Sequence, residues 1–186
     1  MRTILVVLLA LAVAPLGGCA SSGAATRPGD PPAGSAWYTQ FTLQFERGVY
    51  RTTNYRRGFT LPINTAVTLL SMDDGSIVVR IESTGARLEV ENVAKHTNES
   101  TSQAFTRLFG EAPVDLSVFT DDEQTSIRTG RAEVGMGKGA VLAALGPPPA
   151  VGTPALESSE WKYWDSRFST FVVRFDDGGR VVDTGR

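Results

Sequence analysis

The sequence contains one cysteine, Cys19, and one histidine, His96. A single cysteine excludes an internal disulfide framework, and a single histidine excludes a zinc site built from several histidines. Lys and Arg number 18 against 20 Asp and Glu, so the chain lacks the basic excess that is typical of nucleic-acid binders. No apolar run reaches the ~20 residues that a membrane-spanning helix needs. The 41% content of hydrophobic residues is that of a globular protein.

The first residues have the layout of a secretion signal. Met1 and Arg2 give a positive start, an apolar run follows over residues 4–14, and the motif Leu16-Gly17-Gly18-Cys19 comes next. This motif resembles the lipobox of bacterial lipoproteins. The resemblance implies cleavage before Cys19 and attachment of lipid to its sulfur and new amino terminus, with fatty-acyl chains such as palmitate.

The residues that follow the lipidation site indicate a destination. Ala20-Ser21 lacks the aspartate that resembles an inner-membrane retention signal. Several acyl chains on one residue anchor a protein stably, because each buried methylene contributes ~0.8 kcal/mol. We therefore expect a lipid-anchored protein of the outer membrane that faces the periplasm.

The rest of the chain divides by composition into three parts. Residues 19–36 consist mainly of Ala, Ser, Gly, Pro and Thr and predict a flexible tether after the signal peptide of residues 1–18. Residues 37–119 are predicted to form a strand-rich N-terminal module. Residues 120–186 are predicted to form a C-terminal module of mixed α+β type, so the fold class as a whole is α+β.

The N-terminal module shows the period-2 pattern of short antiparallel strands. Asp73-Asp74-Gly75 predicts a hairpin turn, because Asp and Gly tolerate a positive φ. A helix over residues 102–109 is expected to cover one face of the sheet. The segment 54–67, with Pro62 and a Thr65-x-Val67 strand entry, resembles bacterial SH3-like modules of envelope proteins, which implies an SH3-like arrangement.

The C-terminal module begins with a capping-box pattern at Thr120 to Glu123, which predicts a helix to about Arg128 that Gly130 ends. A second short helix is expected to end at Gly146, in the left-handed conformation. Three strands are expected after it, over residues 161–164, 168–175 and 180–182.

Four features of residues 120–183 occur in an order that resembles the SmpA/OmlA family of outer-membrane lipoproteins, the BamE-like proteins. They are Gly135-Met136, the Leu145-Gly146-x-Pro148 helix end, the Trp161-x-Tyr163 strand, and Val173-x-Phe175 with its Asp177-Gly178 turn. The resemblance implies two short helices on a three-stranded antiparallel sheet. It also implies a contribution to outer-membrane protein assembly or envelope integrity. Gly137 departs from the family, which usually has a Ser or Thr cap there.

Two groups of residues are candidates for binding. Arg51, Arg56 and Arg57 form a basic run that could meet anionic lipid headgroups, lipopolysaccharide or peptidoglycan, or else form a solvated strand edge. Trp161 and Tyr163 are candidates for a protein-interaction surface. Alternation along their strand turns Trp164 the other way, so at least one of the two faces is expected to be core.

Enzyme signatures are absent from the sequence, and we expect neither a catalytic residue nor a cofactor nor a metal site. The Gly-Lys pair at Gly137-Lys138 lacks the surrounding P-loop residues. Asp73-Asp74 and Asp176-Asp177 each precede glycine between strands, which indicates turns. His96 is expected in a polar loop.

The function expected from these features is that of a non-enzymatic periplasmic interaction or scaffold protein. Its partners would be envelope proteins, including barrel-assembly components, and its membrane contact would be the lipid anchor. Two alternatives remain open: a peptidoglycan- or lipid-binding protein that uses the N-terminal module, and an enzyme-inhibitor-like protein.

Overall fold

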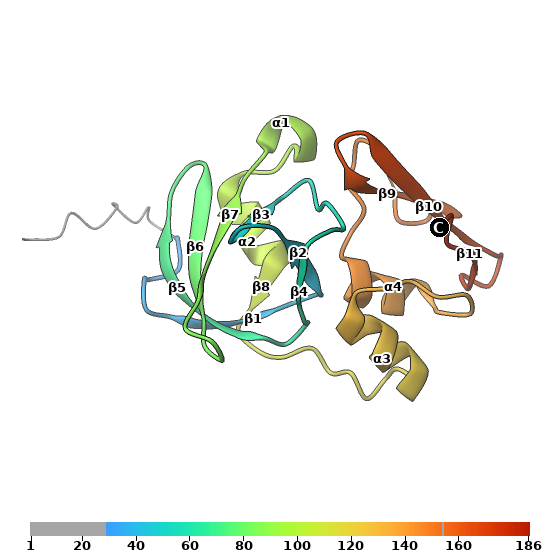
Figure 1. Cartoon of the computed structure of the whole chain (residues 1–186), viewed down its shortest axis with the longest axis horizontal. Coiled ribbons are helices and arrows are strands. Elements are labelled where there is room, and N and C mark those ends of the chain that lie inside the picture. The colour runs from blue at the N-terminus through green and yellow to red at the C-terminus, as the bar shows by residue number, and fades with distance from the viewer. Residues whose placement is uncertain (1–28, 154) are drawn as a thin grey trace, which may run out of the picture.

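The computed structural model describes residues 29–153 and 155–186 (Figure 1). The predicted signal peptide, the Cys19 motif and the first part of the predicted tether lie outside these residues. The described chain is a strand-rich α+β protein with four helices and three sheets, one of them a three-stranded antiparallel sheet. Within the described chain, no helix has the length and apolar character needed to cross a bilayer.

A six-stranded sheet forms the centre of the N-terminal module, with the strand order β3-β7-β6-β5-β1-β8. Its strands are β1 (Ala36–Thr39), β3 (Val49–Arg51), β5 (Ala66–Met72), β6 (Ser76–Ile81), β7 (Arg87–Glu91) and β8 (Phe109–Gly110). Neighbours pair antiparallel, except that β3 runs parallel to β7. The expectation of a purely antiparallel module was therefore wrong, because a period-2 pattern predicts a strand but not its direction.

The β5–β6 hairpin shows how the sheet buries one face. Alternate side chains of the two strands point into the core, among them Val67, Leu69, Ile77 and Val79. The turn lies at Asp73-Asp74-Gly75 as predicted, but none of these three residues has a positive φ. Instead, the Asp73 carboxylate accepts the backbone N–H groups of Gly75 and Ser76 at 2.8 and 2.7 Å. The turn is thus stabilised by a side chain.

Helix α2 (Thr101–Leu108) covers this sheet, within a residue of its predicted bounds. A capping box begins it: the Ser100 hydroxyl accepts from the Gln103 amide, and the Gln103 side chain accepts from the Ser100 amide. The single-turn helix α1 (Ala94–Thr97) precedes it. The side chains that α2 buries include Ala104, Phe105 and Leu108.

The C-terminal module contains two helices and a three-stranded antiparallel sheet of order β11-β10-β9. Its elements are α3 (Asp121–Thr129), α4 (Lys138–Leu145), β9 (Glu160–Ser166), β10 (Ser169–Phe175) and β11 (Val181–Asp183). The capping box at Thr120 and Glu123 is present, and Gly130 has the left-handed conformation that ends α3. At the start of α4, Gly137 makes no side-chain cap.

Gly146 ends α4 in a different conformation from the one expected. Its φ of 75° is positive, but its ψ of 176° is extended, so it is not left-handed helical. A side chain there would clash with the ring of Phe41, since a Cβ atom would lie 2.3 Å from that ring. Contact with the other module therefore selects glycine at this helix end.

The buried side chains form two clusters, one in each module. Ile63 comes from the N-terminal module but packs in the C-terminal cluster. It follows the two-stranded sheet formed by β2 (Leu43–Phe45) and β4 (Phe59–Leu61), which lies on the side of the N-terminal module nearest α3 and α4 (Figure 1). The two modules thus share part of their core.

Arg56 joins the two modules through its guanidinium group, although the residue is only 5% exposed. The guanidinium donates hydrogen bonds of 3.0 to 3.3 Å to five oxygen atoms, which are the backbone carbonyls of Thr42, Gly130, Ala144 and Leu145 and the side-chain oxygen of Asn54. The last residues of α4 and the cap of α3 supply three of these carbonyls. Burial lowers the pKa of Arg56 to about 10, so the group stays charged at neutral pH.

Two neighbours of Arg56 complete this contact. The Thr42 hydroxyl donates to the Ile127 carbonyl at 2.6 Å, and the Asn54 amide donates to the Leu145 carbonyl at 2.7 Å. These carbonyls lie at or near the C-terminal ends of α3 and α4, where the helix dipole places partial negative charge. The Ile127 carbonyl also accepts the Gly130 amide at 3.1 Å. The contact thus adds a second donor to Ile127 and supplies the Leu145 carbonyl with donors from the N-terminal module.

Replacement of Arg56 is expected to destabilise the whole protein. Arg56→Gln removes most of these donors and leaves buried carbonyls unpaired, so we expect a loss of about 3 kcal/mol in the free energy of unfolding. Urea unfolding monitored by circular dichroism measures this free energy of unfolding. The matched change Arg57→Gln breaks an exposed ion pair with Glu46 and a distant contact with the Tyr55 ring, and it should cost less than about 1 kcal/mol. Equal losses would contradict the interface role of Arg56.

Candidate functional site

The segment of residues 51–57 contributes both to the contact between the modules and to an open cleft. Asn54 and Arg56 are buried and donate hydrogen bonds to carbonyls of the C-terminal module. Arg51, Thr53, Tyr55 and Arg57 line the cleft between the two modules. The segment is not a regular strand, since the Asn54 amide donates to the Arg51 carbonyl at 2.8 Å and Asn54 has a φ of 54°. One short segment therefore both joins the modules and forms one wall of the cleft.

The burial of Arg56 corrects the prediction for the basic run. Arg56 was a candidate for binding, but its guanidinium is buried and both of its terminal nitrogens donate to internal oxygens, so it is not presented to a ligand. Arg51 and Arg57 are exposed, and each has a carboxylate partner, Glu91 at 2.8 Å and Glu46 at 2.7 Å. These two arginines remain binding candidates.

The candidates Trp161 and Tyr163 are also corrected, because both side chains are fully buried in the C-terminal core. The Tyr163 hydroxyl donates to the Gly146 carbonyl at 3.0 Å, and its ring stacks on Phe171. Burial raises the pKa of Tyr163, so this hydroxyl stays protonated. Neither residue presents a surface to a partner. Their neighbour Trp164, on the opposite face of β9, lines the cleft.

The cleft consists of two adjoining hollows that share Thr53, Tyr55, His96 and Arg167. The narrow hollow has a volume of about 360 Å³, and its remaining lining residues are Pro149, Val151 and Trp164. The wide hollow has a volume of about 570 Å³, and its remaining lining residues are Arg51, Arg57, Glu91, Val93, Lys95, Ser166 and Phe168. Both modules contribute to each hollow.

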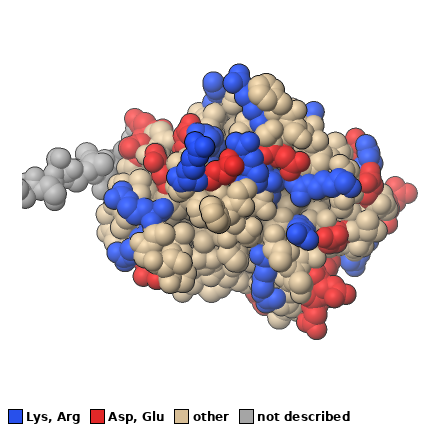
Figure 2. Space-filling model, viewed as in Figure 1, with Lys and Arg blue, Asp and Glu red and all other residues tan. Residues whose placement is uncertain are grey.

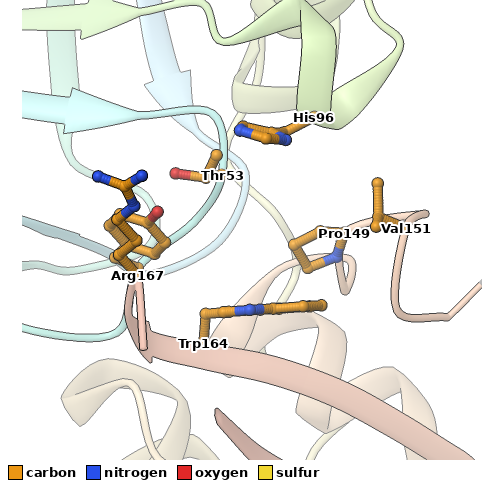
Figure 3. Close-up of a pocket in the computed structure, with 7 residues that line it drawn as sticks. Thr53, His96, Pro149, Val151, Trp164 and Arg167 are labelled. Atoms are coloured by element: carbon orange, nitrogen blue, oxygen red, sulfur yellow. The ribbon is translucent and has the colours of Figure 1, made fainter. Parts of the chain in front are cut away.

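The rings of Trp164 and His96 lie on opposite sides of the narrow hollow, as Figure 3 shows. Pro149 and Val151 close one end, and Arg167 lies at the other. His96 was expected in a polar loop, but it belongs to α1, which holds its exposed side chain at the cleft. The narrow hollow thus lies between two aromatic rings and has the Arg167 side chain at one end.

Trp164 is held in place from several sides. Its backbone carbonyl accepts the Arg56 amide at 2.8 Å, and residues 55 and 164 form a parallel bridge. The Lys162 ammonium lies 5.4 Å from the centre of its ring. The loop at Gly152 fits closely against the ring, since a Cβ atom there would lie 2.3 Å from the indole. This packing fixes the aromatic wall before any ligand arrives.

The wide hollow is predominantly basic. Its lining contains Arg51, Arg57, Lys95 and Arg167 but a single carboxylate, Glu91, which pairs with Arg51. Within residues 29–153 and 155–186, Lys95 and Arg167 have no carboxylate at ion-pair distance. On the face shown in Figure 2, Lys and Arg side chains lie along a band across both modules, with Asp and Glu side chains among them. Two uncompensated cations in a concave site favour an anionic ligand.

The hydroxyl of Thr53 adds a polar group to the narrow hollow. The residue is only 7% exposed, and its hydroxyl finds no hydrogen-bond partner in the described part of the chain. In Figure 3 this oxygen faces the side of the hollow where Arg167 lies. A buried hydroxyl without a partner costs free energy, which a ligand oxygen or amide can recover.

The described residues include no group of three or more His, Cys, Asp or Glu placed to hold a metal ion. What the cleft brings together is an aromatic wall, a buried hydroxyl and exposed cations. This combination can bind a small anionic ligand that has a ring or an apolar face. The sequence pattern indicated Arg51 and Arg57 but not Trp164, Arg167 or His96, which only the folded interface brings together.

Comparison with protein-family models, with curated proteins and with solved structures finds no significant match for this chain. Membership of the SmpA/OmlA family therefore stays a prediction from the four sequence features.

Enlarging Gly152 is expected to displace Trp164. In Gly152→Ala the new methyl group would overlap the indole, so the loop or the ring must move, at a cost of about 1–3 kcal/mol. Two-dimensional NMR of the indole N–H signals and thermal unfolding measure both effects. Gly75→Ala is the matched control, because its added carbon meets no atom closer than 3.9 Å. An unchanged Trp164 signal in Gly152→Ala would refute the close packing.

Proposed function

We propose that this protein is a non-enzymatic outer-membrane lipoprotein that binds an anionic component of the envelope in the cleft between its two modules. One observation carries the proposal: Lys95 and Arg167 lie uncompensated beside the ring walls of Trp164 and His96. Of the functions expected from the sequence, this supports the peptidoglycan- or lipid-binding alternative. The site differs from that alternative, because it uses both modules.

Lipid attachment at Cys19 supplies the location in this proposal. The anchor would keep the cleft close to the membrane and to the cell wall. The support is the sequence pattern around Cys19, since that segment lies outside the described residues.

A second candidate function is a scaffold for barrel-assembly components. It is favoured by the element order of the C-terminal module, two short helices followed by three antiparallel strands, which is the arrangement that the SmpA/OmlA resemblance implies. An SH3-like arrangement of the N-terminal module would have to include the parallel β3–β7 pair. Crosslinking in outer membranes separates the two candidate functions. A scaffold would capture assembly components whether or not the cleft cations are present.

Neutralising the cleft cations is expected to weaken binding to the envelope. The full-length protein in detergent should sediment with purified peptidoglycan sacculi or with anionic lipid vesicles. Lys95→Gln combined with Arg167→Gln should lower the bound fraction about fivefold or more, because two uncompensated charges are lost. Added salt should weaken wild-type binding as well.

The control is Arg128→Gln combined with Arg131→Gln, which removes the same charge from exposed positions outside the cleft. It should bind like the wild type. Binding that survives loss of the cleft cations, or that falls equally in the control, would reject the proposed site.

Loss of the lipidated residue should prevent delivery to the outer membrane. Cys19→Ala removes the acylated sulfur, so we expect an uncleaved or mislocalised precursor, detectable by membrane fractionation and by intact-mass measurement. Cys19→Ser is a closer match in size and should behave in the same way. Normal processing and outer-membrane recovery of either variant would refute the lipoprotein assignment.

A further inference from the structure

The ring walls of the narrow hollow indicate the shape of the ligand. One face of the Trp164 indole is open to the hollow, and the ring of His96 lies across from it (Figure 3). Pro149 and Val151 add apolar surface between them. The C–H face of a sugar ring packs well on an aromatic face, because it is apolar while its edge carries hydroxyl groups. The space between the Trp164 and His96 rings therefore suits a sugar ring, whose two faces could each contact one of them.

The cations lie where a ring in the narrow hollow would carry its charged group. Arg167 lines both hollows, and Lys95 lines the wide one. The Arg167 guanidinium lies 5.4 Å from the centre of the Phe168 ring. No carboxylate of the described chain lies at ion-pair distance from it. A guanidinium fork binds a carboxylate with two parallel hydrogen bonds. The ligand is thus expected to carry an acid group beside its ring.

The unpartnered Thr53 hydroxyl lies between these two parts of the cleft. A sugar hydroxyl or an acetamido group would satisfy it. The volume of about 360 Å³ suits one small ring system. The wide hollow, at about 570 Å³, is open enough for a longer chain to continue from that ring.

We propose that the cleft binds an acidic saccharide, with the sugar ring between Trp164 and His96 and its carboxylate at Arg167 and Lys95. This inference rests on the proposed function and names its ligand class. A carboxylated amino sugar with a free acid has all three groups: an apolar ring face, an acid and an amide.

The first experiment compares two sugars that differ in the acid group. Titration calorimetry of the full-length protein in detergent should show N-acetylmuramic acid binding about tenfold or more tightly than N-acetylglucosamine, because its acid adds charge-assisted hydrogen bonds. Lactate, which carries the acid without the ring, should bind more weakly than N-acetylmuramic acid. Both comparisons use the protein without any change to its fold.

Two variants then assign the parts of the ligand to residues. Arg167→Gln should abolish the preference for the acid while weak binding of N-acetylglucosamine persists. Trp164→Ala should weaken both sugars. The aromatic control is Phe59→Ala, which removes a ring that is 72% exposed and lies outside the cleft. It should bind both sugars like the wild type.

The outcomes separate this inference from the proposed function. If the sugars bind equally, or if neither binds, while sacculi or vesicles still require Lys95 and Arg167, then the acidic saccharide is wrong and the anion-binding function stands. If sacculi and vesicles bind without those cations, the proposed function itself fails. Loss of sugar binding in Trp164→Ala and loss of the acid preference in Arg167→Gln together support the inference.

Discussion

A buried arginine surrounded by backbone carbonyls determines how the two halves of this protein meet. The ends of α3 and α4 both point their unpaired carbonyls at the N-terminal module, where the helix dipoles concentrate negative charge. The Arg56 guanidinium is the cation that compensates both ends at once. Its two terminal nitrogens donate to these acceptors, whereas its Nε finds no partner in the described chain. The carbonyls therefore define the position of the guanidinium relative to the helices. The Arg56 amide also donates a hydrogen bond to the Trp164 carbonyl, which fixes the position of β9 and of the cleft relative to the N-terminal module.

The geometry of the cleft depends on the contact that Arg56 makes between the two modules. Residues of one short segment serve both purposes, so we expect a change that moves Arg56 to move Thr53 and Tyr55 as well. The opposite wall depends on the same contact, because the Trp164 carbonyl accepts the Arg56 amide. The Trp164 ring also packs against Gly152. A ligand site formed in this way needs little ordering when it binds, which lowers the entropic cost of association.

Local features of the sequence predicted local features of the fold. The capping box at Thr120, the glycine end at Gly130 and the apolar face of α2 depend on residues within a few positions of each other, and all are present. Long-range features were not predictable in this way. Arg56 finds its acceptors 74 to 89 positions further along the chain, and an arginine among polar neighbours looks like a surface cation. The alternation along the strand correctly placed Trp161 and Tyr163 on the same face of β9. Which face is buried depends on where α3 and α4 pack, and the alternation does not predict that.

The parallel pairing of β3 with β7 has a consequence for the order in which the chain folds. The two strands are separated by 40 positions, whereas β5, β6 and β7 are joined by tight turns. Closing a long loop costs chain entropy before any pairing is gained, and such contacts slow folding. We therefore expect the β5–β6–β7 meander to form before β3 pairs with β7. On that order, the adjoining segment 52–57, and with it one wall of the cleft, would become ordered after the meander.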